Sequence, residues 1–319
     1  MAIVDVTDLK KAYGEVLAVN GISFRIDQGE VFGFLGPNGA GKTSTINMMI
    51  GLSRPTSGQI MIDGMDGIKE IKKVQSIIGV VPDENNLYDE MDGFDNLCFC
   101  ASLYGLGRVE REKRALELLE RFNLTKAGKR PFKAYSKGMK RKLTIAAGIM
   151  HNPKILFLDE PTTGIDVESA RQIRELILDL KGLGKTIFIT THYIEEAERV
   201  CDRIAFIANG RIVKMGGLDE LMEDIEHEHK IQLQIDGEVE GMEDELEKHF
   251  PACRVEVLDE GSCLIISKER VALSLILQLL DRRGIAVYEA KQIKPSLEDV
   301  FVRVTGIEAS KLEKERVGR

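Results

Sequence analysis

The stretch GPNGAGKT, residues 36–43, follows the apolar run VFGFL and matches the pattern GxxxxGK[ST]. Glycines at these spacings let the backbone curl so that successive N–H groups point inward at an anion. The next residues, KTSTINMMIGL, predict a helix that ends at Gly51, and the positive end of its dipole faces the same anion. A strand, a glycine-rich loop and a helix in this order predict a nucleoside triphosphate site.

The side chains of this loop have separate predicted roles. Lys42 is long enough to reach the β and γ phosphates of the nucleotide, and the hydroxyl of Thr43 is a ligand for Mg²⁺. The loop alone leaves open whether the protein is a kinase, a GTPase or an ATPase that couples hydrolysis to motion. The other residues expected to bind the phosphates are Gly36, Pro37, Asn38, Gly39, Ala40, Gly41 and Ser44.

Two further apolar strands end in groups that suit phosphate chemistry. KILFLDEP, residues 154–161, ends in Asp159, which we expect to hold Mg²⁺ through water, and in Glu160, a candidate to polarise the attacking water. TIFITTH ends in His192, which is placed to hydrogen-bond the γ-phosphate. Taken alone, an acidic pair is as often a solvated turn, and a single histidine after a strand is more often a structural residue.

The composition predicts a globular protein with two domains. The chain has 319 residues, of which 43% are hydrophobic and 30% charged. No apolar run reaches the roughly 18 residues that span a bilayer, and the N-terminus lacks the features of a signal peptide, so we expect a cytoplasmic protein. A net charge of −8 disfavours a nucleic-acid surface. The cysteines form no CxxC pair, which disfavours a disulfide framework or a zinc site.

A basic cluster lies between Lys126 and Lys142, with eight Lys or Arg residues and no acid. A solvated face is the simplest interpretation of such a cluster. Inside it, YSKGMKRKL places Ser136 and Gly138 at the start of an amphipathic helix, which is a second anion-binding helix start. One chain cannot easily bring two such helix starts to one triphosphate, so we expect a partner to complete the site.

Taken in order, these motifs resemble the ATP-binding cassette ATPases over roughly residues 3 to 218. The resemblance rests on Tyr13 in the adenine-stacking position, the loops GPNGAGKT and IGVVPDENNLY, the signature YSKGM, the strand ILFLDEP, the turn TTGID with Asp166, and TTHYIEEAE. It implies an α/β fold at 1–218: a P-loop NTPase (RecA-like) core with an antiparallel β edge, and a helical subdomain at about 86–150. It also implies ATP and Mg²⁺ as ligands, with Tyr13 and Asp166 among the nucleotide contacts.

In this family two cassettes pair head to tail, so that ATP in the phosphate loop of one is closed over by the signature of the other. The resemblance therefore implies that Ser136 and Gly138 act across a dimer interface, in a homodimer or with a related cassette. Asp83 stands where most members have Gln, and YSKGM stands where LSGGQ is usual. A carboxylate can engage Mg²⁺ through water but cannot donate a hydrogen bond as an amide can. We still expect Asp83 to act in catalysis, with Glu84 beside it.

After Leu218 the composition changes, with thirteen acidic residues between Asp219 and Glu247. The pattern then predicts strands at 231–235, 254–259, 263–267 and 285–293, and helices at 239–250 and 269–284. Their order, βαββαβ, predicts a small α+β (ferredoxin-like) domain at 219–319. A last helix at 295–306 has Ser296 and Asp299 at the spacing of a capping box. Both a structural role at the edge of the cassette and a regulatory role are open for this domain.

The segments PSLEDVF, YSKGMKRKL and THYIEEAE further resemble the ATPase subunits of ABC-2 exporters of drugs, lipids and polysaccharides. Those subunits work with separate membrane proteins. This resemblance implies an ATPase, peripheral on the inner face of the cell membrane, that drives a separate transmembrane permease subunit. The alternative is a soluble cassette ATPase that acts on ribosomes or DNA, but this chain has one phosphate loop and no sustained heptads.

Overall fold

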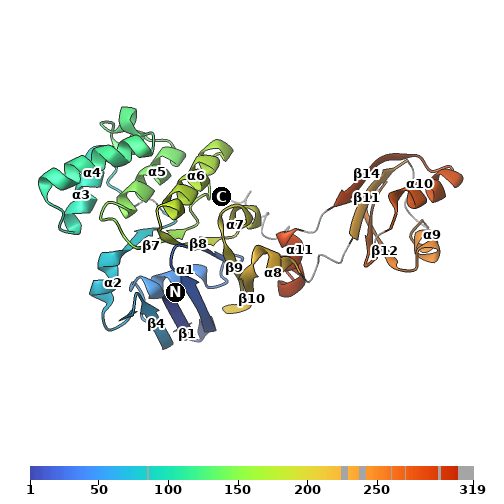
Figure 1. Ribbon diagram of the computed structural model, residues 1–319, viewed down its shortest axis with the longest axis horizontal. Coiled ribbons are helices and arrows are strands. Elements are labelled where there is room, and N and C mark those ends of the chain that lie inside the picture. Colours follow the sequence, from blue (N-terminus) through green and yellow to red (C-terminus); the bar gives the residue numbers. More distant parts are fainter. Residues whose placement is uncertain are drawn as a thin grey trace. The chain divides into compact units, whose positions relative to one another are not determined.

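The computed structural model describes residues 1–84, 86–223, 229–236, 242–259, 261–269, 271–293 and 296–307. Within these ranges the chain forms two compact units that divide after Leu218 (Figure 1). Each unit has its own hydrophobic core. Parts of the predicted C-terminal domain lie outside the described residues, including the start of the helix at 239–250 and everything from residue 308 onward.

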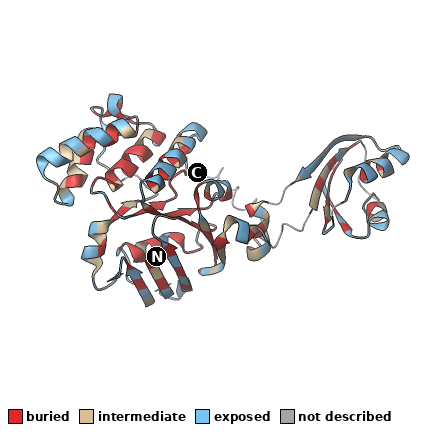
Figure 2. Ribbon diagram, in the orientation of Figure 1, coloured by how far each residue is buried: buried red, intermediate tan, exposed pale blue. Residues whose placement is uncertain are grey.

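A six-stranded sheet forms the centre of the first unit. In sheet order its strands are β10 (Arg211–Gly217), β9 (Arg203–Ala208), β3 (Val31–Leu35), β8 (Thr186–Thr191), β7 (Ile155–Asp159) and β6 (Ile78–Val81). β10 runs antiparallel to β9, and the other neighbours are parallel. Every residue of β3, β7 and β8 is buried, as their apolar sequences predict (Figure 2). Because these strands are parallel, the loops after them meet at one edge of the sheet.

An antiparallel sheet packs against this centre. Its strands, in sheet order, are β2 (Val16–Asp27), β1 (Ala2–Tyr13), β4 (Ser57–Ile62) and β5 (Met65–Asp66). Phe24 of β2 stacks on Phe32 of β3 with 5.5 Å between the ring centroids, and on Phe188 of β8 with 6.0 Å. Stacked aromatic rings bury large apolar areas, so these contacts hold the two sheets together. The predicted antiparallel edge is therefore confirmed.

Helices occupy most of the segment between β6 and β7, where the sequence predicts a helical part. They are α3 (Gly93–Leu103), α4 (Arg108–Arg121) and α5 (Lys137–Gly148). Two of them begin at capping side chains: Asp92 accepts the N–H of Asp95 at the start of α3, and Ser136 accepts the N–H of Met139 at the start of α5. The other helices of this unit are α1 (Lys42–Met49), α2 (Ile71–Ile77), α6 (Val167–Gly182) and α7 (Ile194–Val200).

The basic cluster between Lys126 and Lys142 is more than a solvated face. Several of its members form ion pairs with the acids that follow β6 in the chain. The pairs are Lys129–Asp92 at 3.6 Å, Lys133–Glu90 at 2.7 Å, Lys140–Asp89 at 3.4 Å and Arg141–Asp83 at 3.5 Å. The cluster therefore joins the N-terminal part of α5, and the segment before it, to the chain that leaves β6.

The second unit contains a four-stranded antiparallel sheet. In sheet order its strands are β12 (Cys253–Asp259), β13 (Ser262–Ser267), β11 (His229–Ile235) and β14 (Val287–Ile293). Its helices are α9 (Met242–His249), α10 (Leu273–Arg282) and α11 (Leu297–Thr305), and α8 (Leu218–Met222) begins at the division between the units. The elements from β11 to β14 follow the predicted order βαββαβ. The predicted capping box is also present, because Ser296 and Asp299 each accept the backbone N–H of the other.

Candidate nucleotide site

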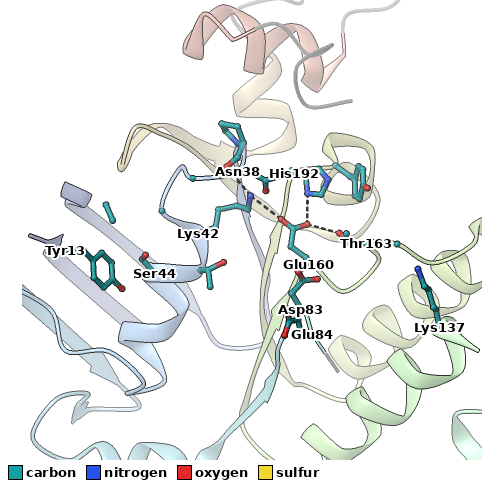
Figure 3. Close-up of a pocket in the computed structure, with 17 residues that line it drawn as sticks. Tyr13, Asn38, Lys42, Ser44, Asp83, Glu84, Lys137, Glu160, Thr163 and His192 are labelled. Atoms are coloured by element: carbon teal, nitrogen blue, oxygen red, sulfur yellow. Dashed lines mark hydrogen bonds and ion pairs between the residues drawn. The ribbon is translucent and has the colours of Figure 1, made fainter. Parts of the chain in front are cut away.

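A pocket of 670 Å³ opens at the edge of the central sheet (Figure 3). It is lined by residues that follow three buried strands: the loop after β3, Glu160 after β7 and His192 after β8. Tyr13 of β1 and Asp83, just after β6, also line it. The loop residues that line it are Pro37, Asn38, Gly39, Gly41, Lys42, Thr43 and Ser44. Most of the predicted phosphate contacts are thus brought to one place.

The glycines of the loop are required by its geometry. Gly41 has a φ of 108°, which side chains rarely adopt, and a Cβ there would lie 2.6 Å from the carbonyl oxygen of Ala18. A Cβ on Gly36 would lie 2.2 Å from the carbonyl oxygen of Ile207. The loop then leads directly into α1 at Lys42, so the free N–H groups of the first helical turn lie at the pocket.

Lys42 is a buried cation that bridges the loop and the strand β7. Only 5% of the residue is exposed. Its Nζ donates to the carbonyl oxygen of Gly36 at 2.7 Å and forms an ion pair with Oε1 of Glu160 at 3.2 Å. A phosphate that entered the pocket would compete with Glu160 for this ammonium group.

Glu160 lies in a strained backbone conformation and in a dense set of contacts. Its φ is 48°, which is uncommon for a residue with a side chain. The carboxylate Oε2 bonds Nδ1 of His192 at 2.8 Å and accepts the hydroxyl of Thr163 at 3.0 Å. Burial acts to raise the pKa of Glu160, but the bond to His192 and the charge of Lys42 outweigh it and lower the pKa below its usual value. Glu160 is therefore an ionised base at neutral pH.

Thr43 and Asp159 carry oxygen atoms of the kind that bind Mg²⁺. Asp159 is 7% exposed and accepts hydrogen bonds from the hydroxyls of Thr190 and Thr43. Burial raises the pKa of Asp159, and the negative charges of Glu160 and Asp83 raise it further. The hydrogen bond from Thr190 acts in the opposite direction and lowers the pKa. A divalent cation beside a buried carboxylate of this kind would stabilise its charged form. The two residues fit Mg²⁺, which usually takes one or two protein ligands beside phosphate oxygens.

Tyr13 lies at one side of the pocket, apart from Glu160 and Asp83 (Figure 3). Half of the residue is exposed, and Lys11 Nζ lies 4.8 Å from the ring centroid. Hydrogen bonds with Ser53 and Ser44 lower the pKa of its hydroxyl. An exposed ring held by its hydroxyl can stack on a base without selecting strongly for one, because every base has an aromatic face.

Five predicted nucleotide contacts do not line this pocket in the single chain: Gly36 and Ala40 of the loop, and Ser136, Gly138 and Asp166. Ser136 caps α5, and Asp166 caps α6 by accepting the N–H of Ser169 at 2.9 Å. Gly138 is buried, and a Cβ there would lie 2.1 Å from Oγ of Ser169. Glycine at this position thus lets α5 begin against the start of α6. The roles of these residues toward ATP remain predictions.

Some residues of the site had no role in the sequence analysis. Thr163 donates to Glu160, and Lys137, the first residue of α5, lines the pocket. Both belong to quoted motifs, TTGID and YSKGM, so their positions were visible but their contacts were not. Arg141 is a third such residue, and the sequence indicated it only as a member of the basic cluster.

Comparison with known proteins assigns the family. The sequence pattern of the family described as ABC transporter matches residues 19–163. The chain is 38% identical to the linearmycin resistance ATP-binding protein of Bacillus subtilis (strain 168), over 94% of this chain and 97% of that protein. It is 35% identical to the daunorubicin resistance ATP-binding protein of Streptomyces coeruleorubidus, over 95% and 96%.

Solved structures agree with the sequences. The ATP binding subunit of an ABC transporter matches with a TM-score of 0.64 at 32% identity, over 70% of this chain and 92% of that one. A dimeric ATP-binding cassette bound to ADP and Pi matches with a TM-score of 0.63 at 28% identity, over 67% and 98%. Together with the pocket, these similarities show that the chain belongs to the ABC transporter family, as an ATP-binding, ATP-hydrolysing protein of its drug-resistance and export group.

Proposed function

We propose that this chain hydrolyses MgATP, as a homodimer or with a related cassette, to drive a separate transmembrane permease on the inner face of the cell membrane. The observation that carries the proposal is Glu160, held ionised between Lys42 and His192 at the edge of the phosphate loop. Mg²⁺, when bound by Thr43 and Asp159, would supply positive charge to the phosphate oxygens.

The chain's own residues have distinct parts in this reaction. When ATP binds, the ammonium group of Lys42 contacts the phosphates in place of Glu160. The carboxylate of Glu160 can then accept a proton from the attacking water. His192 keeps Glu160 oriented through Nδ1. Ser136 and Gly138 of a second cassette would close the site, since they lie outside the pocket in their own chain.

A groove on the first unit supports the proposed permease contact. None of the helices in the described part of the chain has the length and apolar character needed to cross a membrane. The groove, of 520 Å³, runs between Leu52 beyond α1 and Leu103 at the end of α3, which are 74% and 70% exposed. Lys72 and Gln75 of α2 form a polar side. We infer that it receives an amphipathic cytoplasmic segment of the permease.

The proposed role of the groove in permease binding can be tested by placing a charged side chain in it. We expect Leu52→Glu or Leu103→Glu to release the protein from membranes that contain its permease, because a carboxylate cannot be buried there without a partner. Cell fractionation followed by purification in detergent measures the retained complex. Leu116→Glu is the control, since Leu116 is 58% exposed on α4 and does not line the groove. If all three variants stay bound equally, the permease docks elsewhere.

The proposed domain boundary leads to a second prediction. A chain ending at Leu218 should bind ATP with nearly the affinity of the full chain, because the residues that line the pocket run from Tyr13 to Tyr193. The two units also have separate cores, so removal of the second should leave the first folded. Nucleotide titration of both chains, with circular dichroism as the check on folding, decides the matter. A folded but non-binding short chain would place the second unit in the site.

A further inference from the structure

Arg141 is a buried guanidinium directed at the chain that leaves β6. It lies on α5 and is 4% exposed. Its Nη atoms donate to the carbonyl oxygens of Pro82 and Asp83, each at 2.5 Å, and one of them lies 3.5 Å from Oδ1 of Asp83. An arginine that bonds two carbonyls and a carboxylate of adjacent residues fixes both the backbone and the side chain of that segment.

The surroundings of Arg141 are strongly acidic. Burial lowers the pKa of its guanidinium, while the charges of Asp83, Asp159 and Glu160 raise it. Arginine remains protonated in proteins, so a full positive charge faces these carboxylates. Asp83 lines the nucleotide pocket with its side chain 39% exposed. Loss of Arg141 would remove the positive charge that lies 3.5 Å from the carboxylate of Asp83, beside the phosphates.

Among the four cations in the ion pairs of the basic cluster, Arg141 has the most buried side chain, at 5% exposure. Lys129 and Lys133 have side chains that are more than half exposed, and exposed pairs contribute little because water and salt screen them. The Arg141 side chain is buried, so its charge acts over a longer range and cannot be replaced by solvent.

We infer that Arg141 is the positioning residue for Asp83: it holds this carboxylate on α5, offsets its charge, and thereby sets how strongly nucleotide binding depends on Mg²⁺. The inference rests on the proposed Mg²⁺ site. Because Ser136 caps α5, the same contact joins the metal side of the pocket to the helix expected to meet a second cassette.

The test measures the dissociation constant of a fluorescent, non-hydrolysable ATP analogue with Mg²⁺ and with EDTA. The quantity of interest is the ratio of the constant in EDTA to the constant in Mg²⁺. Arg141→Met should raise this ratio about tenfold, because the carboxylate of Asp83, without the charge of Arg141 beside it, repels bare phosphates and attracts Mg²⁺ more strongly. Asp83→Asn should lower it about fivefold, because Arg141 is then unbalanced. The double variant should return to within about twofold of the original ratio.

A matched control separates this role from the loss of any buried ion pair. Arg174 and Glu196 pair between α6 and α7, with side chains 12% and 21% exposed, and neither lines the nucleotide pocket. Arg174→Met should lower the melting temperature of the nucleotide-free protein but leave the ratio unchanged. If Arg141→Met does not fold, Asp83→Asn, at a half-buried position, is measured alone and should still lower the ratio.

Two results would overturn the inference. One is that the two single variants shift the ratio in the same direction or not at all. The other is that the ratio of the double variant stays more than about fivefold from the original ratio. A different result would count against the proposed Mg²⁺ site itself, namely a ratio near one in the unaltered protein, so the two failures can be distinguished.

Discussion

Glu160→Gln should reduce the turnover of ATP by about 10²- to 10⁴-fold, the range that a general base contributes. Gln keeps the shape of the side chain but cannot take a proton from the attacking water. The affinity for ATP should not fall, because the substitution also removes the ion pair that holds Lys42 at 3.2 Å from the carboxylate. Steady-state hydrolysis and nucleotide titration of the same preparation measure the two effects separately.

This variant also tests the shared site. With ATP bound and not hydrolysed, Glu160→Gln should elute from size-exclusion chromatography as a dimer in MgATP and as a monomer without it. Glu84→Gln is the matched control, because Glu84 lines the same pocket and its substitution removes the same charge. Normal turnover in Glu160→Gln, or loss of turnover in both variants to the same extent, would falsify the assignment of Glu160 as the base.

Lys42→Met should weaken ATP binding by about 30-fold or more, which corresponds to about 2 kcal/mol or more for a buried charged contact that loses one partner. Lys42 is only 5% exposed, and its ammonium group lies against Gly36 and Glu160. No cation from the solvent can therefore replace it. Isothermal titration with ATP and Mg²⁺ gives the affinity. Lys154→Met is the control, since Lys154 forms its ion pair with Asp63 and does not line the pocket.

The thermal stability of the nucleotide-free protein is a second measure of the role of Lys42. Loss of the Lys42 ammonium group removes the positive charge beside the buried carboxylate of Glu160, so the melting temperature of Lys42→Met should fall. The double variant Lys42→Met with Glu160→Gln removes both charges and should recover much of that fall while ATP binding stays weak. If the double variant melts no higher than Lys42→Met, the ion pair does not stabilise the empty site.

Much of the site could be predicted because its chemistry depends on local patterns. The run from β3 through the loop to α1 is continuous in sequence, and the strained φ of Gly41 can be adopted readily only by glycine. Likewise, β7 is apolar throughout and ends in Asp159 and Glu160, so parallel pairing alone brings these acids to the phosphate end of the sheet.

The tertiary structure decided the contacts between segments that are distant in sequence. Arg141 and Asp83 are 58 positions apart, and nothing in either local pattern shows that one buried charge balances the other. The same holds for Lys42 at the start of α1, whose ion-pair partner is Glu160, the residue that follows β7.

What the sequence by itself determined is therefore the set of reactive groups, their order along the chain and the strands and helices that carry them, because backbone conformation follows from local side-chain type and spacing. The pairing of charges, the burial that raises the pKa of Asp159 and lowers that of Arg141, and the placing of Ser136 and Gly138 outside the pocket were decided only by the tertiary structure. The physical reason is that desolvation and charge pairing depend on which segments meet, and a single sequence does not record those distances.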